Sequence, residues 1–328
     1  MKYWPTLLLP GGLFLFSLFC LFFLQIFVIK FLQNTDTIFK NYPMKYLLII
    51  PLFFLITIKT KAQEINRFFY EVQYKPKKDS LRNETAMMVL DIKKDQSIFK
   101  DYQLIVSDSI SNEVFKKMQK TGIYENQTAL PNVRFTYSVT KKHPDMEVQY
   151  TEDIMNGLTP ITFGYQEKLN FNWKIQKETQ KIGEYNAQKA TLNFAGRKWT
   201  AWFCKDLPFN DGPYKFNGLP GLIVKIEDDQ QHYSFTLKGN RKAKDSSEDS
   251  LVKKFTSGNV KIVEKGRFTK TFENYKQDPL AAMRSELTPQ LLGMTMPGTD
   301  MKVKDFIEKQ GKEIKESYKL NNNPIERE

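Results

Sequence analysis

Histidine and cysteine, which often act as general base, nucleophile or metal ligand, are scarce in this sequence. The 328 residues include two histidines, His143 and His232, and two cysteines, Cys20 and Cys204. A serine–histidine–aspartate mechanism needs a histidine held between an acid and a nucleophile, and neither histidine lies in a motif of that kind. A zinc site needs three or four closely spaced ligands. We therefore predict no catalytic residues, no metal and no cofactor.

A run of three acids, Glu227-Asp228-Asp229, is the best candidate for acid–base chemistry. Two carboxyl groups on either side of a scissile bond serve glycosidases as acid and as base or nucleophile. Acids in a turn also end a strand in water without any catalytic role. A secreted hydrolase that uses carboxylates is therefore an alternative hypothesis to a non-catalytic protein.

Aromatic residues are concentrated just before this acidic run. Alternation along a strand places Trp199 and Phe203 on one face and Trp202 on the other. We expect one set to fill the core, and the other set to join the loop aromatics in an apolar groove or a patch for a protein partner. The alternative is that all of them pack in the core. The predicted ligand-binding residues are Trp199, Trp202, Phe203, Tyr214 and Phe216.

A segment rich in glycine and proline, from Asp211 to Asp229, connects these aromatics to the acids. Glycine adopts backbone angles that other residues avoid, and proline fixes φ near −65°. A Gly-Leu-Pro-Gly turn followed by a β-branched run is typical of a shaped loop that enters a buried strand. The motif turn consists of Gly218, Leu219, Pro220, Gly221, Leu222 and Ile223.

The elements that must position these residues are mostly strands. Apolar residues alternate with polar ones from Phe68 to Leu237, which predicts about ten strands with one wet face and therefore antiparallel pairing. We predict a mainly β (α+β) fold, a strongly curved antiparallel sheet or half-open barrel. One helix, at Ser107–Lys120, is expected within the sheet-forming half. The strand Leu222–Ile226 should pair with the segment around Phe235.

Four regions are predicted along the chain. Residues 63–240 form the antiparallel β domain, and residues 241–328 form a charged loop with a C-terminal helical extension. Three helices are expected in this extension, and the tail after them is expected to be disordered. The predicted helices are Thr269–Tyr275, Leu280–Leu287 and Val303–Leu320, and the tail is residues 321–324.

Residues 44–62 have the organisation of a secretory signal peptide. Met44-Lys45 is the basic start, Tyr46–Ile58 is the apolar region, and cleavage is expected after the small residue Ala62. We therefore predict an exported protein that is periplasmic, associated with the outer membrane, or secreted.

A second apolar stretch, Leu7–Leu32, lies within residues 1–43 and is long enough to cross a bilayer. One interpretation is that residues 1–43 come from a mis-called start and are never translated. The other is a real membrane helix that tethers the protein as an envelope scaffold. A membrane partner is expected only if residues 7–32 are translated and retained.

The net charge of +12 is modest once the leader is removed. The leader carries six lysines and one aspartate, so cleavage lowers the charge to +7. No helix-turn-helix, zinc-finger or ribonucleoprotein motif accompanies this charge. We predict no nucleic-acid partner.

The motif turn, with flanking segments in the same order, resembles the GLPGLI family of secreted bacterial proteins. The resemblance covers roughly residues 170–240 and includes Asn172–Ile175, Lys189–Thr191, Arg197–Phe203 and Gly212–Ile223. It implies an exported protein of unknown function and carries no known activity. The sequence therefore favours a non-catalytic binding protein of the bacterial envelope, which holds an apolar ligand or a partner protein on a curved sheet.

Overall fold

The computed structural model describes residues 64–122, 131–244, 260–295 and 300–327. All of them belong to one of the two compact units of the chain, and the other unit, residues 13–63, is not described. The predicted signal peptide and the stretch Leu7–Leu32 thus lie outside the described residues. No helix in the described ranges has the length and apolar character needed to cross a membrane.

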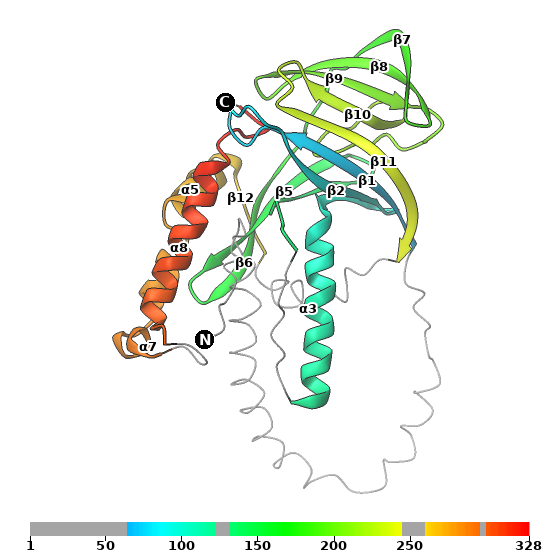
Figure 1. Ribbon diagram of the computed structural model, residues 1–328. Coiled ribbons are helices and arrows are strands. Elements are labelled where there is room, and N and C mark those ends of the chain that lie inside the picture. Colours follow the sequence, from blue (N-terminus) through cyan, green and yellow to red (C-terminus); the bar gives the residue numbers. More distant parts are fainter. Residues whose placement is uncertain (1–63, 123–130, 245–259, 296–299, 328) are drawn as a thin grey trace, which may run out of the picture. The chain divides into compact units, whose positions relative to one another are not determined.

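One sheet of twelve strands dominates the fold, which confirms the predicted mainly β class (Figure 1). The strand order is β12-β6-β5-β4-β3-β2-β1-β11-β10-β9-β8-β7, and the sheet is open, with β12 and β7 as its edges. Neighbouring strands are antiparallel except β12 and β6, which run parallel. The strands are β1 (Glu64–Tyr74), β2 (Glu84–Ile92), β3 (Gln96–Asp101), β4 (Ser138–Lys142), β5 (Glu147–Asn156), β6 (Thr159–Glu167), β7 (Lys174–Ile182), β8 (Tyr185–Phe194), β9 (Arg197–Cys204), β10 (Leu222–Asp228), β11 (Tyr233–Lys244) and β12 (Val260–Val263).

Period-two alternation explains which residues enter the core. In β1, Tyr70, Val72 and Tyr74 are buried and the residues between them are less so. Burial of one face of each strand removes apolar surface from water and fixes the register. The predicted pairing of the motif strand is confirmed, because Ile226 of β10 lies opposite Phe235 of β11.

The β8–β9 hairpin has a two-residue turn. Phe194 pairs with Arg197, so Ala195 and Gly196 form the turn. Both have positive φ, 51° and 69°. Positive φ at both central residues is the type I′ geometry that matches the twist of two antiparallel strands.

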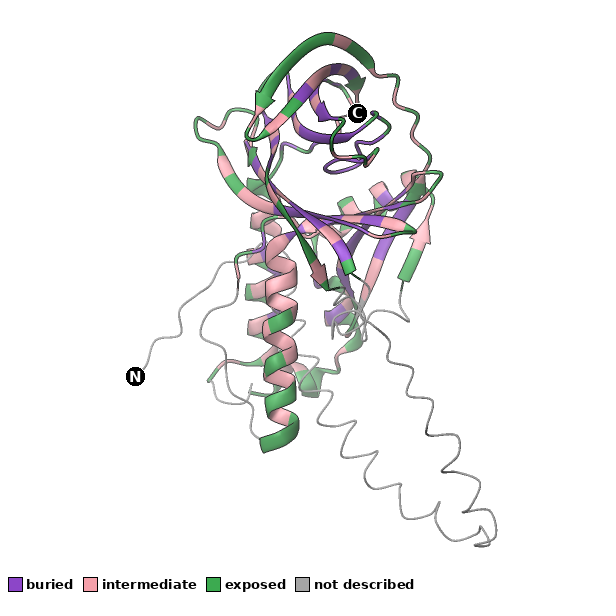
Figure 2. Ribbon diagram, turned by 90° about the vertical axis from the view of Figure 1, so that its right-hand side faces the viewer, coloured by how far each residue is buried: buried purple, intermediate pink, exposed green. Residues whose placement is uncertain are grey.

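Helix α3 (Tyr102–Thr121) is the predicted helix of the sheet-forming half, but it begins five residues before Ser107. The earlier start follows from Asp101, whose side chain accepts a hydrogen bond of 2.8 Å from the backbone N–H of Gln103. Gly122 ends the helix at φ 68°. None of the helix residues is fully buried (Figure 2).

The C-terminal helices pack on the β6 side of the sheet. Phe268 of α5 lies with its ring centroid 5.2 Å from that of Phe163, and Phe272 contacts Tyr318 of α8. The predicted helix Val303–Leu320 is confirmed at both ends. The helices are α5 (Lys265–Gln277), α6 (Ala281–Glu286), α7 (Pro289–Gly293) and α8 (Val303–Leu320).

The prediction of a disordered tail after α8 is wrong from Asn323 onward. Asn323 is 2% exposed and Ile325 is 6% exposed. The side chain of Asn323 bonds to the fold through both its oxygen and its nitrogen. Composition predicted disorder because the segment is polar, but polar groups that find specific partners are held in place.

Candidate functional site

The motif segment is a buried loop that leads into β10. Every residue from Asp211 to Asn217 is buried. Gly221 has a φ of 146°, and a Cβ atom at this position would lie 2.2 Å from the carbonyl oxygen of Cys204. Only glycine fits this close approach of two backbones.

Lys141 of β4 contacts the motif loop and holds it against the sheet. Its side chain is fully buried, and its Nζ lies 2.5 Å from Asp211 Oδ1. The same ammonium group donates to the carbonyl oxygens of Gly212 (2.6 Å), Tyr214 (3.1 Å) and Phe216 (3.4 Å). Four acceptors at the loop replace the water that this cation loses on burial.

The electrostatics of this ion pair favour the charged form of the acid. Burial is the largest single influence and raises the pKa of Asp211, but the Lys141 ammonium group together with His143 and Ser97 brings the pKa below its usual value. Burial lowers the pKa of Lys141, and Asp211 opposes the change. The pair is therefore a charged clamp within the core.

His143 lies at the rim of this clamp. Its Nε2 atom is 4.0 Å from Asp211 Oδ2. The interaction with the Asp211 carboxylate is the main reason that the pKa of His143 lies above its usual value. Asp211 sits between a lysine and a histidine, whereas a catalytic triad places the histidine between the acid and the nucleophile. The cluster therefore has the arrangement of a structural ion network.

A second buried cation, Lys215, lies within the loop itself. Its Nζ donates to Tyr165 Oη at 2.7 Å and lies 2.5 Å from Glu167 Oε1. It also forms an ion pair with Glu326 of the C-terminal tail. Lys265 of α5 completes the network with contacts of 2.8 Å to Glu167 and 3.2 Å to Glu326. The loop, β6, α5 and the tail thus meet in one network of two lysines and two glutamates.

The structure separates the five predicted ligand-binding aromatics. Trp199, Phe203, Tyr214 and Phe216 are buried, and the rings of Trp199 and Phe216 lie 4.8 Å apart. Because they are buried, these four rings are not accessible to a ligand from solvent in this structure. Trp202 lies on the opposite side of β9 and is half-buried, with Lys189 Nζ 5.9 Å from its ring centroid. Ligand binding by any of the five stays a prediction.

The three acids that suggested a hydrolase have separate surroundings. Asp228 is buried and forms an ion pair of 2.8 Å with Arg197, and it accepts a hydrogen bond from the N–H of Tyr233. Glu227 pairs with Lys225 at 2.8 Å on the other side of the strand. Asp229 is exposed in the turn. Alternation along β10 sends neighbouring carboxylates to opposite faces, so they do not form a facing pair.

A buried acid that the sequence did not single out is Glu152 of β5. It is 5% exposed and accepts hydrogen bonds from Tyr150 (2.8 Å) and Thr136 (2.7 Å). Burial raises its pKa from 4.5 to about 7. Tyr150 joins a row of stacked rings that includes Tyr137 and Tyr165.

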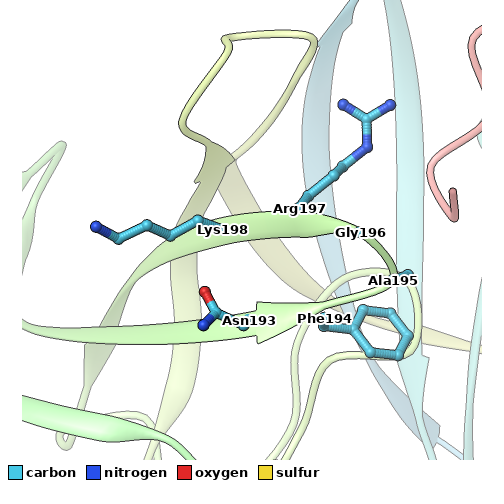
Figure 3. Close-up of a pocket in the computed structure, with 6 residues that line it drawn as sticks. All are labelled: Asn193, Phe194, Ala195, Gly196, Arg197 and Lys198. Carbon is cyan, nitrogen blue, oxygen red and sulfur yellow. The ribbon is translucent and has the colours of Figure 1, made fainter.

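A pocket of about 390 Å³ lies at the β8–β9 turn (Figure 3). Six consecutive residues, Asn193 to Lys198, line it. Arg197 and Lys198 point away from one another. A single hairpin supplies every lining residue among those described, whereas a typical ligand site is formed by groups that converge from several elements.

Among the residues that sequence reasoning missed, Lys141 carried a usable signal. It lies two positions after Val139 in β4, so alternation places it on the buried face. Lys215 follows no periodic pattern, because it lies in a loop. Within the described residues, no group of three or more His, Cys, Asp or Glu side chains could hold a metal ion.

Comparisons with known proteins place one short match on this site. A family model described as "Protein of unknown function (Porph_ging)" matches residues 195–225, from the β8–β9 turn into β10. A comparison with curated proteins gives no match.

Two solved structures are similar to the chain. They are described as "Structure of PNGF-II in C2 space group" and "Structure of PNGF-II in P21 space group". Each is 13% identical, with TM-scores of 0.44 and 0.45. The alignments cover 65% and 66% of this chain but 33% and 34% of those chains, so this chain spans about a third of their length. A likeness this weak carries no functional conclusion.

Proposed function

We propose that this chain is an exported, non-catalytic binding protein that holds a partner protein on the solvent side of strands β8, β9 and β10. Two occupants were open from the sequence, an apolar ligand and a partner protein. Burial of four of the five candidate aromatics favours the protein partner, because a small apolar ligand needs ring faces that it can reach.

The observation that carries this proposal is the position of Trp202. It lies in the middle of a row of three side chains across neighbouring strands, opposite Lys189 of β8 and Lys225 of β10. Thr200 of β9 lies two residues away on the same side, opposite Thr191 and Glu227. We call Lys189, Thr191, Thr200, Trp202, Lys225 and Glu227 the β8–β10 face; all six are half-buried. Tryptophan surrounded by polar residues is typical of the centre of a protein interface.

The neighbouring edge strand supports the same proposal. Among the strands of the described residues, β7 pairs only with β8, so one side of its backbone has no strand partner there. Most of its nine residues are exposed, and Ile175 is 50% exposed. An open edge can accept an extended segment of another protein by strand addition.

We further propose that the chain is a GLPGLI-family protein that residues 44–62 direct to export. The motif turn Gly218–Ile223 supports this proposal, and the match at residues 195–225 lies on the same segment. Amino-terminal sequencing of the exported protein tests it. A mature chain that begins at Gln63 is the expected result, and a chain that retains residues 7–32 contradicts it.

Partner capture by Trp202→Ala tests the binding function. The protein is cross-linked in its native cells, and the amount of each cross-linked partner is measured against wild type. Loss of a central tryptophan costs about 2 kcal/mol or more at an interface, so we expect roughly a thirtyfold loss of capture. Lys116→Ala, at an exposed residue of α3 outside the β8–β10 face, is the control and should capture normally. If Trp202→Ala captures every partner at wild-type levels, the proposal is wrong.

A further inference from the structure

The last described residues of the chain lie in a site built to receive them. Helix α8 ends at Leu320, and the next two residues, Asn321 and Asn322, are exposed. The chain then returns to the sheet, where Asn323 and Ile325 are buried. Two exposed residues therefore separate the helix from a short, firmly held segment, Asn323–Arg327.

Arg197 recognises the backbone of this segment. Its Nε donates to the carbonyl oxygen of Ile325 at 2.8 Å, and its Nη2 donates to that of Pro324 at 2.7 Å. Tyr233 Oη donates to the carbonyl oxygen of Asn323 at 2.5 Å. The ion pair with Asp228 holds the guanidinium group in place. Three successive carbonyl groups are thus satisfied by side chains of β9 and β11, as in the capture of an extended peptide.

Three side chains of the segment also have dedicated partners. Asn323 donates from Nδ2 to the carbonyl oxygen of Lys75 at 2.8 Å and accepts from Arg197 at 2.9 Å. Ile325 packs in the main hydrophobic core. Glu326 pairs with Lys215 and Lys265 and accepts a hydrogen bond of 2.7 Å from Tyr214. The site therefore selects an amide, an apolar side chain and an acid in a fixed order.

The turn of the β8–β9 hairpin lies against the end of the segment. The carbonyl oxygen of Ala195 accepts a 3.0 Å hydrogen bond from the N–H of Arg327. A Cβ atom at Gly196 would lie 3.0 Å from the Cβ of Arg327 and 3.3 Å from its carbonyl oxygen. Glycine here permits both the positive φ and the close approach of the segment.

We propose that these groups form a peptide-binding site for an extended segment of the type Asn-Pro-apolar-acid, and that the C-terminal segment of a second copy of this chain can occupy it. We call Arg197, Tyr214, Lys215, Tyr233 and Lys265 the tail site. The segment that occupies the tail site, Asn323–Arg327, is connected to helix α8 by only two exposed residues. A second copy carries the same segment and reproduces each contact, which is the condition for exchange between protomers.

The chain's own segment competes with any incoming one. A tethered segment has an effective concentration on the order of millimolar. Exchange between copies is therefore expected at high protein concentration or after the internal segment is released. The tail site lies on the opposite side of β9 from Trp202. Partner binding at the β8–β10 face and peptide binding at the tail site can therefore be tested and disproved separately.

Release of the internal segment tests the site directly. The full-length variant Ile325→Asp/Glu326→Lys loses the apolar contact and reverses the charge that faces Lys215 and Lys265. A fluorescent peptide of residues 321–327 is then titrated into it. We expect saturable binding that is at least tenfold tighter than to wild type, and no binding of a control peptide with the same two substitutions. Equal binding of both peptides, or none by the folded variant, overturns the proposal.

Hydrogen exchange on unmodified wild type keeps the test decisive if the variant does not fold. The backbone N–H groups of Asn323 and of residues 325–327 are measured with and without a large excess of the unlabelled peptide; Pro324 has none. The peptide should displace the internal segment, and the exchange of these amides in the protein should become faster. Unchanged exchange means that the segment is a permanent part of the fold, and the proposal is then wrong.

A capture experiment identifies the second copy as the source. A tagged Ile325→Asp/Glu326→Lys chain, whose tail site is empty, is mixed with untagged chains at high concentration. It should retain untagged wild type, which supplies an intact segment, and should not retain the untagged variant. Equal retention of both chains, or of neither, contradicts exchange of the segment between copies.

Discussion

Single charged residues inside the core account for the position of the motif loop. Lys141 reaches from β4 to four acceptors in the loop, and Asp211 neutralises it. A buried ion pair contributes little compared with a well-packed apolar pair, but removal of one partner leaves an uncompensated charge. The clamp therefore fixes one conformation of the loop rather than adding much net stability.

Replacement of Lys141 by methionine should destabilise the fold by about 3–5 kcal/mol, because the Asp211 carboxylate stays buried without its cation. Urea unfolding followed by circular dichroism measures the change. Lys142→Met, which alters an exposed lysine of the same strand, should stay within about 0.5 kcal/mol of wild type. Equal stability of the two variants would contradict the role of the clamp.

Glu152 should make stability depend on pH. Its pKa in the folded chain is about 7, raised from 4.5 chiefly by burial, while Thr136 and Tyr150 oppose the shift and Asp153 and Lys276 have smaller, opposite effects. A raised pKa means that the folded state favours the protonated acid. The stabilisation is complete below pH 4.5 and is lost as the pH rises through 7.

Glu152→Gln isolates this effect, since glutamine stays neutral. The variant should match wild type near pH 4.5 and exceed it by up to about 3 kcal/mol at pH 8. The measurement is the free energy of unfolding in urea at both pH values. A difference between variant and wild type that does not change with pH would show that the acid ionises normally.

At the scale of elements, alternation predicted the strands well and their distant partners poorly. The hairpin register of β10 and β11 follows from a short turn, so the Ile226–Phe235 pairing could be foreseen. The pairing of β1 with β11 joins segments more than 150 residues apart, and β12 pairs in parallel with β6, where Val260 lies opposite Thr162, 98 residues earlier. Period two specifies which face is buried but not which strand lies alongside.

The candidate site was predicted in part for the same reason. Sequence alone identified the motif turn and its aromatics, because glycine, proline and large rings are recognisable by type. It missed Lys215 and the tail, because their burial depends on partners from β6, α5 and the loop. A polar residue that is satisfied by distant groups leaves no local pattern.

Two glycines of the motif turn should respond differently to alanine. Gly221→Ala adds a clash with Cys204 to an unfavourable φ of 146°. Gly218→Ala has only the positive φ of 88°, and nothing lies within 4 Å of the added Cβ. We expect Gly218→Ala to lower the free energy of unfolding by about 1–2 kcal/mol, and Gly221→Ala to lower it by at least about 2 kcal/mol more. Urea midpoints measure both, and similar midpoints would contradict the close approach.

Viewed as a whole molecule, the described part of the chain is one open sheet with a protected edge. The exposed side chains of β7 include Lys174, Lys177, Glu178 and Lys181. Charges on an edge strand discourage random pairing with other molecules. The same edge can still admit a specific partner that neutralises the charges.

Removal of two edge charges should cause association. Lys177→Val/Lys181→Val would extend the apolar character of Ile175 along one side of β7, and we expect light scattering to rise with protein concentration. Lys198→Val, in the interior strand β9, introduces valine away from an edge and should stay monodisperse. If wild type, the double variant and Lys198→Val all scatter light alike, the edge charges have no protective role.

The sulfur of Cys204 is completely buried, so the rate of its chemical modification reports on local opening of the protein. Alkylating reagents react with the thiolate, and they can reach this one only when the end of β9 separates from the start of β10. The rate of Cys204 alkylation in native buffer would therefore measure how often these two strand ends separate, with no probe added to the chain.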